Sequence, residues 1–364
     1  MKNLLFSTTR QWNIGDEFIL FGVRNILEEF YTSRGEKKPF NPIIYNRNPS
    51  ITPVFHRSLS GYIKKHVHSL MAECDNSIHE RIDAGFIDAA ICAGTPEWRG
   101  ERMLQFYKIV NQYKLPFLAL GVGEIGPFNR PVEEDVIKNA SILTFRSPKL
   151  AAKARQLGLN NAIYLPCPAL LSIKPDEEKQ WQSNAGEITI GLGFNIPREY
   201  TVPYIGISRE TYDFTERLFA EVLKSYGQSC KFVGICHYVD ELPYAIKFFS
   251  KWNIDVLYSY DARDYGEIYS GVDLLISSRV HGCGIAASLG IPSLGISHDE
   301  RGDTINGFLA EVVTPKEEIK SCMIKIASII DNADEKHSLL VEHKKTTLQQ
   351  YVEILSKNAP FLKY

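Results

Sequence analysis

The stretch from Gly271 to Ser297, GVDLLISSRVHGCGIAASLGIPSLGIS, constrains the fold more than any other part of the chain. It opens with an almost continuous apolar run at 273–277, which is typical of a parallel strand buried on both faces. Small residues from Gly282 onward allow a helix to pack closely on a sheet, and Gly290 predicts its end. Because a second strand follows at 293–296, the stretch predicts a strand, helix, strand unit of an open α/β sheet.

Polar and cationic residues gather where the first of these strands ends. The turn Ser278-Arg279-Val280-His281-Gly282 lies between the strand and the helix. Open α/β sheets bind ligands at the carboxyl ends of their strands, and the N–H groups of a helix N-terminus favour an anion. We therefore expect Arg279 and His281 to face a bound anion, with Ser278, Val280 and Gly282 beside it.

Composition limits the class of protein. A length of 364 residues with 44% hydrophobic content allows two ordinary domain cores. The formal net charge of −2 gives no basic excess, which disfavours nucleic acid as a partner. The first residues, MKNLLFSTTRQWN, hold an apolar run far too short for a signal peptide or a membrane span. We expect a cytoplasmic protein without a transmembrane segment, and peripheral attachment at the inner membrane face stays open.

The cysteines and histidines do not predict a metal site. The seven cysteines stand singly, without a CxxC pair, which argues against a zinc site and against a disulfide framework. Four histidines fall between His56 and His79, but their spacing fits no standard ligand pattern. We therefore expect no metal and reduced cysteines.

The N-terminal half alternates strands and helices, and several of its loops carry candidate site residues. The turn before the first helix contains Asn13, Gly15 and Asp16, which suit either a ligand-binding turn or a well-capped helix. Two later loops, each after a predicted strand, carry Glu97 with Trp98 and, further on, Glu124. The strands expected in this half are 4–8, 42–45, 86–93, 116–120, 141–145 and 163–165, and the helices are 18–30, 101–113 and 148–157.

Two further features of this half have competing interpretations. Gly121-x-Gly123-x-x-Gly126 spells the dinucleotide fingerprint, but it lies several elements into the domain and prolines follow where the binding helix should run. Arg146 lies between a strand and a helix whose start is marked by Ser147 and Pro148. This arginine suits an anion in the cleft or a surface salt bridge.

A polar, charged segment divides the chain into two α/β halves. In the second half the expected strands are 188–194, 230–235, 255–257, 273–277 and 293–296, with helices at 210–226, 240–252, 263–270, 316–330 and 335–355. His237 follows one of these strands, where a core or solvent histidine is the more frequent outcome. We expect two Rossmann-like βαβ domains facing across a cleft, the architecture called GT-B. Their expected limits are 1–171 for the N-terminal domain on the acceptor side, 172–186 for the linker, 187–334 for the C-terminal domain on the donor side, and 335–364 for a helix that can cross back to the N-terminal domain.

Three motifs carry a family resemblance. Ser278-Arg279-Val280-His281-Gly282 with the small residues after it resembles the signature of the polysaccharide pyruvyltransferase family. Asn13-Ile14-Gly15-Asp16-Glu17 resembles that family's N-terminal motif, and Arg146-Ser147 resembles its middle arginine turn. One departure concerns the loop after the third strand, which reads Gly94-Thr95-Pro96-Glu97-Trp98 with a single glycine and puts the shape of the acceptor pocket in doubt.

The resemblance implies transfer of a pyruvyl group from phosphoenolpyruvate to two hydroxyls of a sugar in a polysaccharide or its precursor, which forms a cyclic ketal. Arg279 and Arg146 are then the donor-binding arginines, because guanidinium forks match carboxylate and phosphate bidentately. His281 is the expected proton donor to the vinyl carbon, and a role limited to hydrogen bonding the phosphate is the alternative. No metal or other cofactor is needed beside the phosphoenolpyruvate donor.

The acceptor side is less closely defined. The general base is expected among Asp16, Glu97, Glu124 and Asp299, and Glu97 is placed best by its loop. Sugar faces stack on aromatic rings, for which Trp12, Trp98 and Tyr204 are candidates. The sugar, its hydroxyl pair, any lipid carrier and the oligomeric state do not follow from the sequence. Two alternatives remain, namely a nucleotide-sugar glycosyltransferase of GT-B architecture and a binding protein without turnover.

Overall fold

The chain forms two compact units, each built on a parallel β-sheet. The computed structural model describes residues 1–8, 14–35, 40–46, 84–93, 103–174, 181, 188–197, 206–297 and 299–363. One unit comprises Met1–Ser172 with Thr346–Tyr364, and the other comprises Ile173–Lys345. Within the described ranges, no helix is both long and apolar enough to cross a membrane.

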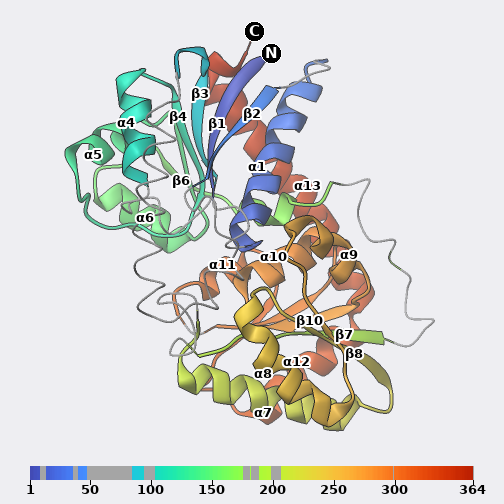
Figure 1. Ribbon diagram of the computed structural model, residues 1–364. Coiled ribbons are helices and arrows are strands. Elements are labelled where there is room, and N and C mark those ends of the chain that lie inside the picture. Colours follow the sequence, from blue (N-terminus) through green and yellow to red (C-terminus); the bar gives the residue numbers. More distant parts are fainter. Residues whose placement is uncertain are drawn as a thin grey trace. The chain divides into compact units, whose positions relative to one another are not determined.

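The sheet of the first unit has the strand order β2-β1-β3-β4-β5-β6, and all its neighbouring strands are parallel. Its two central strands, Ala89–Ala93 and Phe117–Val122, are wholly apolar, as expected for parallel strands with both faces covered. Figure 1 shows α4, α5 and α6 on one side of this sheet and α1 on the other. The strands are β1 (Lys2–Thr8), β2 (Phe40–Asn46), β3 (Ala89–Ala93), β4 (Phe117–Val122), β5 (Ile142–Phe145) and β6 (Ala162–Tyr164). The helices are α1 (Ile14–Thr32), α4 (Leu104–Gln112), α5 (Pro131–Lys138) and α6 (Pro148–Gln156).

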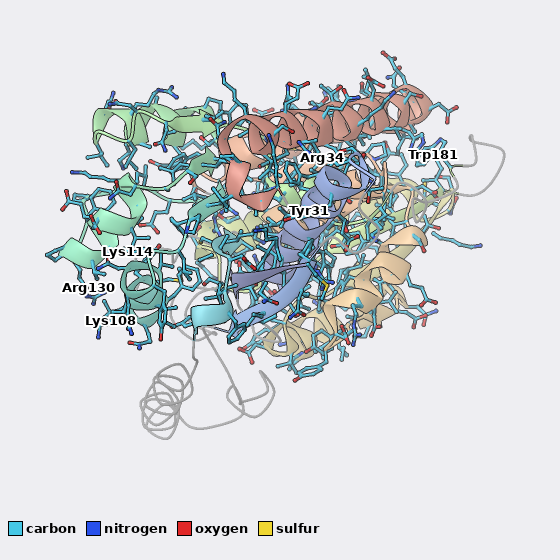
Figure 2. The ribbon with its side chains drawn as sticks, turned by 90° about the horizontal axis from the view of Figure 1, so that it is seen from above. Tyr31, Arg34, Lys108, Lys114, Arg130 and Trp181 are labelled. Carbon is cyan, nitrogen blue, oxygen red and sulfur yellow. The ribbon has the colours of Figure 1, made fainter. Side chains whose placement is uncertain are left out.

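The last helix, α13 (Ala333–Asn358), belongs to both units, because the division falls between Lys345 and Thr346. Its C-terminal part packs in the first unit, where Tyr351 donates a hydrogen bond to the carbonyl of Pro166 at 2.8 Å. Arg34, at the end of α1, donates to Ser356 Oγ at 2.7 Å (Figure 2). The first unit therefore takes its final element from the far end of the chain.

The second sheet has the order β12-β11-β10-β7-β8-β9 and is also parallel throughout. In Figure 1, α7, α8 and α12 lie on one side of it and α9, α10 and α11 on the other. The strands are β7 (Ile188–Gly193), β8 (Cys230–Ile235), β9 (Val256–Leu257), β10 (Leu274–Ser277), β11 (Ser293–Ile296) and β12 (Glu311–Val313). The helices are α7 (Arg209–Tyr226), α8 (Leu242–Phe249), α9 (Tyr265–Ser270), α10 (Val280–Ser288), α11 (Gly302–Asn306) and α12 (Ile319–Asp331).

Three of the described strands and α-helices were not predicted. The short helix α11 and the short strand β12 lie between the expected strand 293–296 and the expected helix 316–330. Helix α5, which begins at Pro131, is the third. Proline is tolerated in the first helical turn because its missing N–H would have no partner within the helix there.

Little of the predicted linker 172–186 lies within the described residues, but one side chain of it is clearly placed. Trp181 donates from Nε1 to Asp334 Oδ1 at 2.7 Å, and its ring stacks on that of His337 with centroids 4.6 Å apart. Both partners lie on α13. This tryptophan therefore joins the segment between the two sheets to the last helix.

Candidate functional site

The carboxyl edge of the second sheet holds the densest group of buried polar residues in the described part of that unit. In chain order β7, β8 and β9 extend the sheet in one direction, and β10 then starts the other side next to β7. Open α/β sheets bind their ligands at such a reversal of strand order, beyond the carboxyl ends of the strands, which here are β7 and β10. The turns after β8 and β10 supply the polar groups.

Arg279 forms the N-cap of α10, directly after β10. Its backbone N–H donates to Ser277 Oγ at 3.0 Å, which fixes the turn. The turn lies against β7 so closely that a Cβ on Gly193 would overlap Ser277 Oγ, which explains the glycine there. The side chain of this N-cap residue makes no capping hydrogen bond among the described residues, and the partial positive charge of the first turn of α10 favours an anion.

The two neighbours of this arginine in the motif differ in exposure. Ser278 is 2% exposed, and its Oγ has no hydrogen-bond partner among the described residues. His281, in the first turn of α10, is half-buried. Because a buried hydroxyl without a partner is costly, Ser278 is a natural donor to a ligand.

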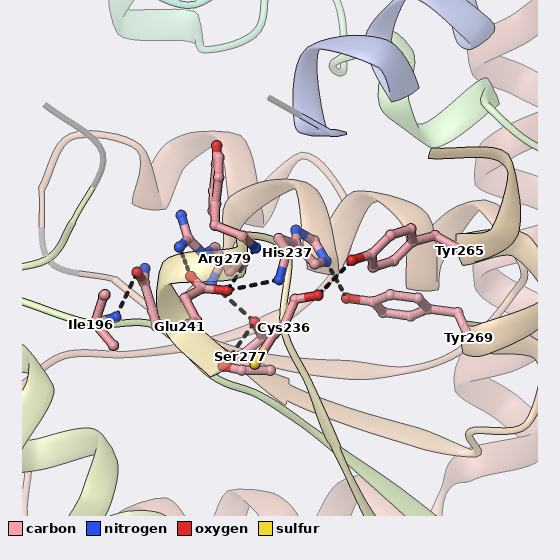
Figure 3. Close-up of polar contacts among 11 residues, drawn as sticks. Ile196, Cys236, His237, Glu241, Tyr265, Tyr269, Ser277 and Arg279 are labelled. Carbon is pink, nitrogen blue, oxygen red and sulfur yellow. Dashed lines mark hydrogen bonds and ion pairs between the residues drawn. The ribbon is translucent and has the colours of Figure 1, made fainter. Parts of the chain in front are cut away.

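A buried carboxylate holds the guanidinium of Arg279. Glu241 is fully buried and forms an ion pair through Oε1 with Arg279 Nη2. Its Oε2 accepts backbone hydrogen bonds from His237 at 2.7 Å and from Tyr238 at 3.0 Å (Figure 3). The ring of Tyr238 lies 4.4 Å from Arg279 Cζ, within cation–π distance. The turn after β8 therefore contacts the arginine through one ion pair and one ring.

His237 lies close to the ion pair of Arg279 and Glu241 and is a buried, uncharged histidine. Its Nε2 lies 2.9 Å from the hydroxyl of Tyr269, and the residue is 5% exposed. Burial, assisted by the charge of Arg279, lowers the pKa of His237 to about 3. The neighbouring thiol of Cys236 has its pKa raised to about 12 by burial. Neither group carries charge near neutral pH, so Arg279 and Glu241 are the charged pair of the cluster.

Arg146 also lies in a turn between a strand and a helix, between β5 and α6 of the first unit, and it is 2% exposed. Its guanidinium packs so closely on the backbone of Gly123 that a Cβ there would overlap it. Burial raises the pKa of the Cys167 thiol, and Arg146 acts in the opposite direction while Asp16 adds to the rise. These influences place Arg146, Cys167 and Asp16 close together in the interior of the unit.

The remaining predicted residues that the structure describes lie on several elements of the two units. Val280 and Gly282 lie buried in the first turn of α10, and Gly15 with Asp16 lies buried in the first turn of α1. Glu124 is exposed after β4. Asp299 is exposed, and its carboxylate forms an ion pair with Arg301 at 2.8 Å. The predicted residues that lie outside the described ranges are Trp12, Asn13, Glu97, Trp98, Tyr204 and the histidines between His56 and His79.

The glycine fingerprint has a structural explanation. Gly121 has a φ of +75°, and a Cβ there would overlap the ring of Pro168. Gly123 makes room for Arg146. The glycines of this motif thus serve close packing at the end of β4, and the helix that follows, α5, starts only at Pro131.

Sequence reasoning missed Glu241, Tyr238 and Tyr269. Glu241 satisfies the same rule that selected Glu97 and Glu124, since it is a carboxylate just beyond the carboxyl end of a strand. The position of Glu241 beyond the end of a strand was therefore visible in the sequence. The contact between Glu241 and Arg279 depends on the strand order β10-β7-β8, which cannot be read from the linear sequence.

Comparison with known proteins agrees with this geometry. The family model described as polysaccharide pyruvyl transferase matches residues 13–300. No curated protein matches the chain.

Solved structures share the fold at low sequence identity. MnaA of S. aureus, solved with UDP, is 13% identical with a TM-score of 0.57, covering 93% of this chain and 91% of its own. The UDP-GlcNAc 2-epimerase of Neisseria meningitidis, bound to UDP-GlcNAc, is 13% identical with a TM-score of 0.56, covering 98% of this chain and 100% of its own. Anabaena HepE, in complex with UDP-glucose, is 12% identical with a TM-score of 0.53, covering 98% and 100%. These likenesses confirm the predicted α/β fold class of two Rossmann-like domains of GT-B type.

Proposed function

Because the chain belongs to the polysaccharide pyruvyl transferase family, we propose that it transfers a pyruvyl group from phosphoenolpyruvate to two hydroxyls of a sugar and forms a cyclic ketal. The observation that carries the proposal is the position of Arg279 at the uncapped N-terminus of α10, beside the buried hydroxyl of Ser278. This combination suits a small, highly charged anion. The acceptor class, a polysaccharide or its precursor, is plausible from the family.

In this proposal the donor binds at the first turn of α10. Arg279 offers a planar fork to a phosphate or carboxylate, and the helix N-terminus adds its backbone N–H groups. Ser278 supplies a further hydrogen bond, which removes the cost of its buried hydroxyl. Arg146 was predicted as a second donor-binding arginine, and its packing in the interior of the first unit gives it an equally good structural role.

The proposed reaction begins with a proton from His281 to the methylene carbon of the donor. Protonation makes the neighbouring carbon electrophilic, and the first sugar hydroxyl attacks it and loses its proton to a base. Cleavage of the carbon–oxygen bond to phosphate, followed by attack of the second hydroxyl, closes the ketal ring and releases inorganic phosphate. Arginine and the helix N-terminus supply the positive charge that this route needs, so the proposal includes no metal and no other cofactor.

Glu97 is the proposed general base. Of the other candidates, Asp299 is in an ion pair with Arg301. Asp16 is buried and Glu124 is exposed. The test is a comparison of the four single Asp→Asn and Glu→Gln variants at saturating donor, where loss of the base lowers kcat by about a hundredfold or more.

A nucleotide-sugar reaction is the second candidate. The solved structures of similar fold contain UDP, UDP-GlcNAc and UDP-glucose. On the same scaffold, Arg279 and the first turn of α10 would hold a diphosphate instead of the phosphate of phosphoenolpyruvate. The two candidates therefore differ in the ligand and share the anion site.

A thermal-shift comparison separates them. The purified protein is heated with phosphoenolpyruvate, with inorganic phosphate and with a panel of nucleotide sugars, because a ligand at about 100 times its Kd stabilises the folded state by about 2.7 kcal/mol. We expect phosphoenolpyruvate to stabilise the protein well beyond phosphate. Stabilisation by a nucleotide sugar alone would replace pyruvyl transfer with the second candidate. A His281→Ala variant that binds phosphoenolpyruvate but releases no phosphate with acceptor sugars would support the proton-donor role.

A further inference from the structure

Glu241 differs from a surface carboxylate in its burial and in its hydrogen-bond and ion-pair partners. It is fully buried at the end of a short turn after β8. One carboxylate oxygen accepts two backbone N–H groups, at 2.7 and 3.0 Å, and the other faces Arg279. Backbone donors stabilise the ionised carboxylate, so the negative charge stays in place whether or not a ligand is bound.

Tyr238 holds the same guanidinium from a second direction. Its ring centroid lies 4.4 Å from Arg279 Cζ, and the residue is 7% exposed. Both contacts come from the turn after β8, whereas the arginine follows β10, and β7 lies between these strands. The contacts therefore bridge the switch point of the sheet.

We propose that Glu241 is a positioning residue that fixes the fork of Arg279 for the donor, a role that rests on the proposed function. A long arginine side chain loses rotamer freedom when it binds an anion, and a guanidinium already held by an ion pair and a ring loses less. The ion pair also offsets part of the charge of Arg279, so the first turn of α10 contributes a larger share of the positive potential at the site. Glu241 thereby raises the affinity for a donor that needs an oriented guanidinium. It has little effect on the affinity for a small anion that binds the guanidinium in any orientation.

The chain offers a matched control. Glu317 repeats the chemistry of Glu241, since its Oε1 accepts from the backbone N–H of Thr314 at 2.9 Å and its Oε2 pairs with Lys325 at 2.9 Å. It lies after β12, and its side chain is 30% exposed. Glu317→Gln therefore removes the same charge and the same kind of ion pair without affecting Arg279.

The experiment is titration calorimetry of the full chain with phosphoenolpyruvate and with inorganic phosphate. We expect Glu241→Gln to weaken phosphoenolpyruvate binding by about tenfold, the effect of one newly immobilised side chain. Phosphate binding should stay within about twofold, because removing a nearby negative charge offsets the lost orientation. Glu317→Gln should leave both affinities unchanged. Equal affinity of the folded Glu241→Gln protein and the wild type for phosphoenolpyruvate would overturn the proposal.

A second variant covers the case in which Glu241→Gln does not fold. Tyr238→Leu removes the ring from the same guanidinium and should weaken phosphoenolpyruvate binding by about threefold, whereas Tyr238→Phe, which keeps the ring, should not. Equal affinities of these two variants would contradict the positioning role.

Failure of the proposed function gives a different result. If the wild type binds neither ligand, pyruvyl transfer is wrong. The positioning is then tested alone by the NMR signal of the Arg279 Nε–H group, which is assigned by its loss in Arg279→Lys. A signal that is unchanged in Glu241→Gln would then overturn the role of Glu241.

Discussion

Arg146 and Arg279 each lie in a turn between a parallel strand and a helix, and their surroundings differ. Arg146 lies between β5 and α6, and Arg279 lies between β10 and α10. Helix α6 is capped by Ser147, whose side chain accepts from the backbone N–H of Leu150 at 3.4 Å. The side chain of Arg279, the N-cap residue of α10, makes no capping hydrogen bond among the described residues. The comparison predicts that an anion binds beside Arg279 more readily than beside Arg146, because the N-terminus of α6 already has a side-chain partner.

The two arginines also differ in how tightly the surrounding residues pack against them. The guanidinium of Arg146 lies against the backbone of Gly123 and near the thiol of Cys167, inside the first unit. The side chain of Arg279 is 12% exposed and pairs with Glu241. Arg146 is thus suited to hold its own domain together, and Arg279 is suited to meet a ligand.

The largest expected effect comes from removing Arg279. Arg279→Ala should weaken phosphoenolpyruvate binding by about 2 to 5 kcal/mol, because a desolvated charge contact is lost. Arg146→Met should instead lower the free energy of unfolding and change donor affinity less. Calorimetry and urea denaturation of both variants measure the two quantities. The comparison breaks down if Arg146→Met weakens donor binding as strongly as Arg279→Ala while its stability is unchanged.

A glycine next to each arginine gives a second test. Gly123→Ala places a methyl group on the guanidinium of Arg146, and overpacking of this kind costs about 1 to 3 kcal/mol. In α10, a Cβ on Gly282 would lie 3.0 Å from the hydroxyl of Tyr269, which needs only a small shift. We therefore expect a much smaller loss of stability for Gly282→Ala, measured by urea denaturation. Equal losses would mean that Arg146 moves away easily and is less tightly packed than the structure has it.

The predictions from sequence succeeded where one local rule decides the structure. Strands such as β8 and β11 were predicted with their observed bounds because buried parallel strands are continuous apolar runs bounded by turns. The turn at Arg279 was placed correctly at the start of a helix for the same reason. Strand β12 was missed, and its pairing with β11 is known only from the fold.

The ion pair of Arg279 lies beyond such rules. Glu241 and Arg279 belong to turns after different strands, and they meet because β7 alone separates β8 from β10. The hydrophobic periodicity of a strand predicts which of its residues face the core, but it does not predict which strands lie next to it. The domain limits show a related difficulty, since one continuous helix, α13, contributes to both units and its pattern contains no break at Lys345.

The acid sensitivity of the second unit tests the burial of His237. Its pKa of about 3 in the folded state lies below the ordinary value of 6.5, so the unfolded chain binds the proton more tightly between these values. Stability is therefore fully present above about pH 6.5 and falls toward acid by about 1.4 kcal/mol per pH unit, or about 2 kcal/mol by pH 5. His237→Gln should remove this part of the slope in urea denaturation at several pH values. An unchanged slope would mean that His237 is accessible to protons in the folded protein.

The smallest effects come from the two serines beside the arginines, and they separate the units most directly. Ser147→Ala removes the cap of α6 and should lower the free energy of unfolding by about 1 kcal/mol without changing donor affinity. Ser278→Ala should do the reverse, because its buried hydroxyl has no hydrogen-bond partner to lose among the described residues and its proposed partner is the ligand. We expect donor affinity to fall by about 1 kcal/mol, or about fivefold, with stability unchanged or slightly raised. Each variant is the control for the other, measured by calorimetry and by urea denaturation. If Ser278→Ala loses stability and keeps its affinity, the hydroxyl serves the fold, and the anion site must be built from Arg279 and the helix N-terminus alone.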